Sequence, residues 1–130
     1  MKYLCLVLAL WSFVPGCAPV NGGDQHKEQP IQNIVYIPDF VDTEAEAMSL
    51  HQKTGKPAII VAARTNCPWC DKFKQETLNP IRQELGQEII ICYTYDIKER
   101  LFPTFWIVKN NVRSKFVGYM DKAEVYSNLN

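Results

Sequence analysis

Two cysteines of the chain, Cys67 and Cys70, lie three residues apart with only a proline and a tryptophan between them. Thiols at this spacing can form a reactive dithiol that opens and closes as a disulfide, or they can supply half of the ligands of a zinc site. A chain with this many cysteines would show the spacing by chance in roughly one case in seven. The spacing alone therefore does not distinguish a dithiol from a zinc site, and the residues around the pair are needed as evidence.

A zinc site would require two further ligands at a suitable spacing. The two histidines, His26 and His51, are both distant in sequence from the cysteine pair. Cys92 lies within an apolar run that predicts a buried strand, so we expect it to pack as a small hydrophobic residue. The sequence favours a dithiol over a metal centre. We expect no metal and no cofactor besides the cysteine pair itself.

The residues before the cysteine pair predict a buried strand, and those after it predict a helix. Residues 56–63, KPAIIVAA, form a continuous apolar run, which is typical of a central strand covered on both faces. Pro68 suits the first position of a helix because its missing N–H is not needed there. We interpret 68–78 and 80–85 as two helical pieces, divided where Asn79 precedes a proline.

The rest of the pattern alternates helices with strands. Helices are predicted from capping residues at 43–54 and 121–129. Apolar runs and turn residues predict further strands at 33–37, 88–95, 102–108 and 112–119. This order predicts an α/β fold in which a central mixed sheet of four to five strands is flanked by helices.

The first residues predict an export signal rather than part of the fold. Lys2 is followed by about a dozen almost entirely apolar residues, too few for a membrane helix but suited to a signal peptide. The sequence VPGC at 14–17 resembles a bacterial lipoprotein box, in which the cysteine, here Cys17, is lipidated. Pro15 departs from that pattern, and ordinary cleavage shortly after Cys17 is the alternative. Both interpretations stay open.

Residues 18–33 are polar and rich in Gly, Pro and Gln, a composition that predicts a flexible linker. We therefore divide the chain into a signal peptide at 1–17, this linker, and one folded domain at 34–130. The predicted location is outside the cytoplasm, in the periplasm or cell envelope, with a membrane tether if Cys17 is lipidated. Lys plus Arg and Asp plus Glu each number 14, so no net charge attracts nucleic acid. We expect a monomer.

With these elements in place, residues 34–129 resemble the thioredoxin superfamily. The motifs that carry the resemblance are Cys67-Pro68-Trp69-Cys70 after a strand, Phe102-Pro103-Thr104 at the start of a strand, and Gly118 before the last helix. In that superfamily the proline that corresponds to Pro103 is cis and lies beside the dithiol. The resemblance implies a thioredoxin-like fold and thiol–disulfide oxidoreductase activity on protein disulfides.

The resemblance also implies roles for individual residues. Cys67, at the helix start, would be the attacking thiolate, favoured by unpaired backbone N–H groups, and Arg64 adds positive charge nearby. Cys70, one turn deeper, would complete the exchange. Pro68 would support the helix start. The residues expected to contact the extended chain of a protein substrate or redox partner are Trp69, Phe102, Pro103 and Thr104.

Two features depart from the superfamily pattern. Thioredoxin proper has a buried acid six residues before its first cysteine, where this chain has Val61. Only residues 96–101 are available where the family commonly has a helix. Six residues can cross the end of one strand if the next strand is antiparallel. The direction of the exchange stays open, and the absence of a histidine between the cysteines favours reduction over oxidation.

Two other functions remain as alternatives. The motif with a proline and an aromatic residue between the cysteines is similar to that of glutathione-dependent glutaredoxins, although VGYMD at 117–121 has one glycine where glutaredoxins present two. The second alternative is a binding module without enzymatic activity, in which the disulfide is structural. Turnover of a disulfide substrate would separate the enzymes from the module, and glutathione dependence would separate the two enzymes.

Overall fold

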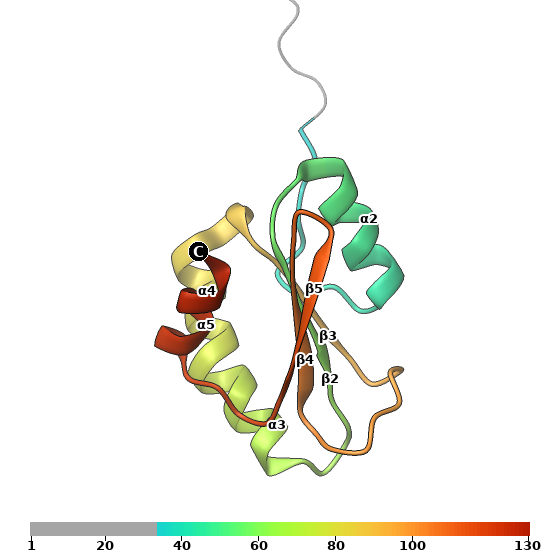
Figure 1. The fold of residues 1–130 in the computed structure, drawn as a ribbon, viewed down its shortest axis with the longest axis vertical. Coiled ribbons are helices and arrows are strands. Elements are labelled where there is room, and N and C mark those ends of the chain that lie inside the picture. Colours follow the sequence, from blue (N-terminus) through green and yellow to red (C-terminus); the bar gives the residue numbers. More distant parts are fainter. Residues whose placement is uncertain (1–33) are drawn as a thin grey trace, which may run out of the picture. The chain divides into compact units, whose positions relative to one another are not determined.

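Four strands form a mixed sheet at the centre of residues 34–130, the part of the chain that the computed structural model describes (Figure 1). Their order across the sheet is β3 (Ile90–Thr94), β2 (Ala58–Ala62), β4 (Thr104–Lys109) and β5 (Val112–Val117). The pair β2 and β3 is parallel, whereas β4 is antiparallel to both β2 and β5. The predicted signal peptide, linker and Cys17 lie outside the described residues, and no described helix is long and apolar enough to span a membrane.

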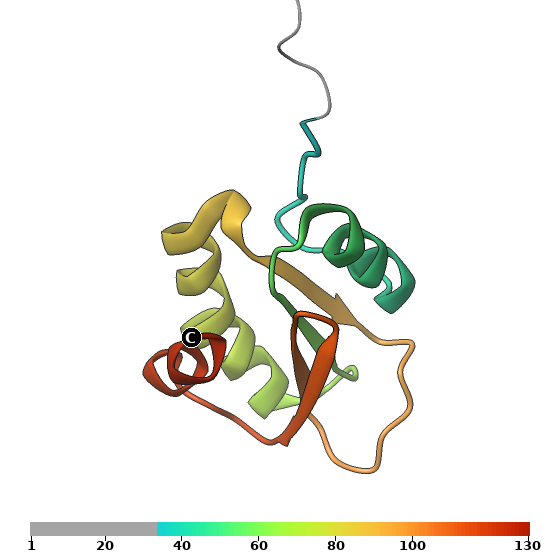
Figure 2. The ribbon, with the colours of Figure 1, turned by 45° about the horizontal axis from the view of Figure 1, so that its top comes forward.

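Helices cover both faces of this sheet, as the two views show (Figures 1 and 2). They are α2 (Glu44–Thr54), α3 (Pro68–Phe73), α4 (Asn79–Leu85) and α5 (Lys122–Leu129). The core towards α2 contains Ala58 and Ile60 of β2, and the core towards the other three helices contains Ile59 and Val61. Successive side chains of β2 are thus buried on opposite faces. The structure confirms the predicted α/β fold with helices on both faces of a mixed sheet.

Two of the helices, α2 and α5, begin at the capping residues that the sequence predicts. The hydroxyl of Thr43 accepts the N–H of Glu46 at 3.2 Å, and Gly55 closes α2 with a φ of 74°, in the left-handed region that glycine tolerates. A carboxylate oxygen of Asp121 accepts the N–H of Glu124 at 2.9 Å at the start of α5. Local hydrogen bonds therefore set where these helices begin, as expected.

The strand predicted at 33–37 does not form in the part that the structure describes, which is irregular. The chain pairs with the sheet only at Val41, whose N–H donates to the carbonyl of Ile91 at 2.8 Å. The carbonyl of Val41 accepts the N–H of Tyr93 at 3.1 Å. Pro38 lies between this bridge and the expected strand, and a longer ladder fails there because proline has no N–H to donate.

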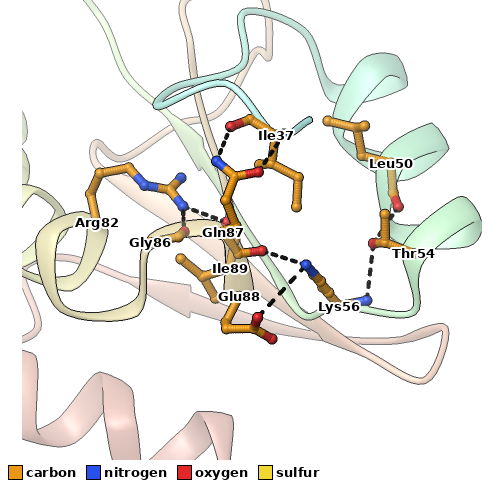
Figure 3. A network of polar contacts seen from close by, with 9 residues as sticks. All are labelled: Ile37, Leu50, Thr54, Lys56, Arg82, Gly86, Gln87, Glu88 and Ile89. Atoms are coloured by element: carbon orange, nitrogen blue, oxygen red, sulfur yellow. Dashed lines mark hydrogen bonds and ion pairs between the residues drawn. The ribbon is translucent and has the colours of Figure 1, made fainter. Parts of the chain in front are cut away.

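Side chains 43 and 50 residues away in the sequence, rather than a strand ladder, hold this N-terminal segment (Figure 3). The amide of Gln87 accepts the N–H of Ile37 at 2.8 Å and donates to its carbonyl at 2.7 Å. The guanidinium of Arg82 donates to the carbonyls of Asp39 at 2.9 Å and Ile89 at 2.8 Å, and it also bonds the carbonyl of Gly86. Arg82 is buried, and this burial lowers its pKa although the Asp39 carboxylate acts in the opposite direction.

The residues predicted to be helical after the cysteines are helical, but the predicted division at Asn79 is wrong, because α3 continues into α4 without a break. A π-helical turn, Lys74–Leu78, joins them, and the N–H of Asn79 donates to the carbonyl five residues back, at Lys74. In a regular α-helix Pro80 would leave one carbonyl without a donor and would press its ring against that carbonyl. The wider π-turn relieves this conflict, so the helix changes pitch instead of ending.

The connection from β3 to β4 brings three segments to one end of the sheet. Because β4 is antiparallel to β2 and lies on the side away from β3, residues 95–103 cross the end of β2 (Figure 1). This geometry is the one predicted from the short connection. The cysteine pair follows β2 directly, so it lies at the same end of the sheet as the start of β4.

We expect the change Arg82→Met to lower the free energy of unfolding by about 2–4 kcal/mol, since it leaves several buried carbonyls without a donor. Urea denaturation followed by tryptophan fluorescence measures the loss. The matched control is Arg113→Met, because Arg113 is exposed and forms one surface ion pair with Glu44 at 2.6 Å, which contributes less than about 1 kcal/mol. Equal losses in the two variants would contradict the bracing role of Arg82.

Cys92 is fully buried in the core beneath α2, on the face of the sheet opposite the cysteine pair. Burial raises the pKa of its thiol to about 12, and repulsion from nearby carboxylates acts in the same direction. At about pH 9, where an ordinary thiol is largely ionised, we expect the folded protein to leave Cys92 unreacted with iodoacetamide. Peptide mapping by mass spectrometry checks this, with urea-unfolded protein as the labelled control. Rapid labelling of the native protein would show that the thiol is accessible.

Candidate active site

Cys67 and Cys70 form a disulfide at the start of α3, with their Cα atoms 5.2 Å apart. The strand β2 leads into a short turn in which Asn66 has a φ of 56°, a left-handed conformation that asparagine tolerates. Cys67 is the N-cap of the helix and Pro68 occupies its first turn. The Sγ of Cys67 accepts the N–H of Cys70 at 3.2 Å. The fold thus places one sulfur of the pair where backbone N–H groups point.

The two cysteines differ in burial. Cys70 is fully buried, whereas Cys67 keeps 4% of its surface exposed. Only Cys67 can therefore be reached from outside, and a partner has to press closely against the neighbouring surface to contact its sulfur. The side chain between them, Trp69, is 55% exposed and forms part of that surface.

The segment before β4 lies at this end of the sheet. The peptide bond between Phe102 and Pro103 is cis. The carbonyl of Pro103 accepts the N–H of Gly118 at 2.7 Å, and Gly118 has a φ of 95°, which a residue with a side chain rarely adopts. This hydrogen bond joins the start of β4 to the end of β5.

Thr104 does not lie where the sequence led us to expect. It is fully buried, and its hydroxyl donates to the carbonyl of Leu101 at 2.7 Å. A buried hydroxyl with an internal acceptor is not available to a partner, so the side chain of Thr104 does not offer the predicted substrate contact. The residue instead braces the loop that precedes β4.

A hollow of about 240 Å³ opens beside the cysteine pair. Three segments line it: the start of α3, the loop before β4 and the residues after β5. The lining residues are Trp69, Phe102, Pro103, Gly118 and Tyr119. Phe102 and Tyr119 also pack against the core cluster that contains both cysteines. Tyr119 was not among the residues expected at the site, although its place directly after Gly118 was a usable signal.

Cationic side chains lie over several of these rings. The Nζ of Lys72 is 4.9 Å from the ring centres of both Trp69 and Tyr119. The guanidinium carbon of Arg64 is 5.4 Å from the ring centre of Phe102. Arg64 was expected to support the thiolate of Cys67, and the structure places it, exposed, at the rim of the hollow.

The floor of the site is apolar. Val61, at the position where thioredoxin proper has an acid, is fully buried in the cluster that contains both cysteines. Among the described residues no Asp or Glu is buried. In the same part of the chain, no group of three or more His, Cys, Asp or Glu residues is arranged to hold a metal ion. Beneath the rim, the polar groups next to the cysteine pair in the described structure are therefore the two sulfurs and the backbone around them.

No family model matches the sequence, and no curated protein sequence matches it. Solved structures do resemble the fold. Chloroplastic thioredoxin z superimposes with a TM-score of 0.58 at 12% identity, covering 75% of this chain and 95% of that one. A thioredoxin-like protein from Clostridium perfringens gives 0.57 at 22%, covering 72% and 79%. A thioredoxin from Thermus thermophilus gives 0.53 at 18%, covering 69% and 82%.

Identities this low establish the fold and nothing finer. The described part of the chain therefore has a thioredoxin-like α/β fold, with a four-stranded mixed sheet flanked by helices and with a cysteine pair of CxxC spacing at the start of α3.

Proposed function

We propose that this protein is a thiol–disulfide oxidoreductase that acts on protein disulfides through Cys67 and Cys70. The observation that carries the proposal is the asymmetry of the pair: one sulfur reaches the surface beside a hollow, and the other is sealed beneath it. Exchange needs this arrangement, since one sulfur must meet the partner while the second stays protected until it resolves the intermediate.

In the reducing direction, the thiolate of Cys67 attacks one sulfur of a partner disulfide. A new bond forms between Cys67 and that sulfur, and the other partner sulfur leaves as a thiolate and takes a proton. Cys70 then loses its proton and attacks Cys67, which breaks the mixed disulfide and releases the partner as a dithiol. Two electrons and two protons pass to the partner, and an external dithiol must restore the reduced form. Oxidation of a partner is the reverse sequence.

The local structure favours the first step. The N–H of Cys70, 3.2 Å from the Sγ of Cys67 in the disulfide form, is positioned to stabilise a thiolate there. The second step differs from that of thioredoxin proper, since Val61 cannot accept the proton of Cys70. We propose that this proton leaves through the partner or solvent that meets Cys67.

Recognition of a partner's backbone is part of the same proposal. Among the described residues, no backbone hydrogen bond uses the N–H or carbonyl of Phe102. Its neighbour Pro103 already accepts from Gly118. An extended segment of the partner could therefore pair with Phe102 as an added strand, which would hold the partner's cysteine near Cys67.

The location and direction are proposals that rest on sequence. The apolar run after Lys2 supports export to the periplasm or cell envelope, and Cys17 offers a membrane tether if it is lipidated. A cation between the cysteines would stabilise the thiolate of the reduced form and so make the disulfide a stronger oxidant. This chain has no histidine there, which supports the reducing direction.

A second candidate is a binding module that lacks enzymatic activity and keeps the disulfide as a structural link. The small exposed fraction of Cys67, 4%, favours it, because a structural disulfide needs no access. A glutaredoxin-like enzyme would have the same fold but would require glutathione as the reductant. Turnover with a dithiol reductant in the absence of glutathione separates both alternatives from the proposal.

We expect the wild-type protein to reduce a peptide with one internal disulfide repeatedly when a small dithiol is supplied. The change Cys67→Ser should lower the rate to that of the dithiol alone. The change Cys70→Ser should stop after a single covalent adduct between Cys67 and the peptide, because the resolving thiol is absent. Chromatography and intact-protein mass spectrometry measure turnover and adduct.

The matched control is Cys92→Ser, which removes the buried thiol on the other face of the sheet and should retain turnover. No turnover by the wild-type protein would favour the binding module. Equal adduct formation by the Cys67→Ser and Cys70→Ser variants would contradict the assigned roles of the two sulfurs.

A further inference from the structure

Two cations, Lys72 of α3 and Arg64 of the turn before it, lie over aromatic rings. Lys72 lies 4.9 Å from the ring centres of both Trp69 and Tyr119, and Arg64 lies 5.4 Å from that of Phe102. All three rings line the hollow beside the cysteine pair. Cation–π contact restricts where each charge can sit, so less conformational freedom remains to be lost when a ligand binds.

These two charges have no carboxylate partner within the described residues. Four ion pairs form there, and they use Lys56, Lys115, Lys122 and Arg113. Arg64 and Lys72 are both exposed and lie in none of them. A carboxylate of a partner could therefore pair with these cations without breaking an existing ion pair.

Of the acids in the same helical stretch, Asp71 acts away from the hollow, whereas Glu76 lies beside it. Burial raises the pKa of Tyr93 to about 12, and Tyr95 and then Asp71 act in the same direction, so the charge of Asp71 is felt on the Tyr93 side. Lys74 lies on that side too, 4.6 Å from the ring centre of Tyr93. Glu76 accepts a hydrogen bond from the hydroxyl of Tyr119 at 3.3 Å. Two cations, Lys72 and Arg64, and one carboxylate, that of Glu76, therefore lie beside the lining of the hollow, so the net charge there is positive.

We propose that the partner segment that docks beside Cys67 is acidic: a bulky apolar side chain next to the partner's cysteine fills the hollow, and an adjacent Asp or Glu pairs with Lys72 and Arg64. This inference rests on the proposed function and specifies its substrate class. The apolar lining supplies contact area, and the two cations select the charge of the segment.

The size of the expected selection follows from the exposure of the cations. An exposed ion pair strengthens binding by about 1.5- to 5-fold. Replacing an acidic residue of the substrate by Lys also turns attraction into repulsion at both cations. We therefore expect the rate constants of the acidic and basic substrates to differ by about tenfold at low salt. Since the charges are exposed, about 1 M salt should remove most of that difference.

The test uses four peptides, each with one cysteine as a mixed disulfide with thionitrobenzoate, whose release is coloured. The residue before the cysteine is Phe or Ser, and the residue after it is Glu or Lys. The full-length reduced protein reacts with each peptide, and every second-order rate constant is divided by that of dithiothreitol with the same peptide. We expect the Phe–Glu peptide to react about tenfold faster than the Phe–Lys peptide, and faster than both Ser peptides.

Variants assign the preference to the cations. The changes Lys72→Gln and Arg64→Gln should each lower the Glu-over-Lys ratio by about two- to threefold, and the double variant should lose most of it. The matched control is Lys53→Gln, because Lys53 is an exposed lysine at the end of α2 and lies outside the site.

Equal normalised rates for all four peptides would overturn the acidic-segment proposal and leave the oxidoreductase function standing. Reaction with none of them would overturn both. A Glu-over-Lys ratio that survives in the double variant would overturn the assignment to Lys72 and Arg64.

Discussion

The antiparallel pairing of β4 with β2 is the constraint on which the candidate site depends. Its register places Thr104, the first residue of β4, opposite Ala62, the last residue of β2. The chain that leaves β2 towards Cys67 and the chain that enters β4 through Pro103 therefore lie at one end of the sheet. A parallel β4 would start at the other end, and the proline segment would be separated from the cysteines by the length of a strand.

The chemistry follows from how this end of the sheet is enclosed. Apolar packing seals Cys70, leaves Cys67 only 4% exposed and excludes any buried carboxylate from the floor of the site. Reactivity then depends on backbone N–H groups within the site and on what a partner brings to it. The exposed ring of Trp69, the partly buried ring of Tyr119 and the Lys72 cation over both form the rim that we propose selects partners.

Much of the fold could be predicted because its signals are local. The runs that became β2 and β3 are apolar on both faces, and the caps at Thr43 and Asp121 bond residues three positions away. The failures have physical causes as well. Pro38 separates the expected N-terminal strand from the bridge at Val41, whereas Pro80, preceded by a helical Asn79, is accommodated by a π-turn that sequence rules do not anticipate.

By itself the sequence determined the strand-to-helix turn that carries Cys67 and Cys70, because adjacency, helix capping and apolar runs act over a few residues. Only the tertiary structure decided which distant groups complete the site and brace the fold. Tyr119 meets Trp69 across the sheet end, Arg82 bonds the carbonyl of Asp39, 43 residues away, and Thr104 turns inward. At such sequence separations many polar and aromatic residues are candidates for the same contact. Which of them make it depends on the packing of the whole core.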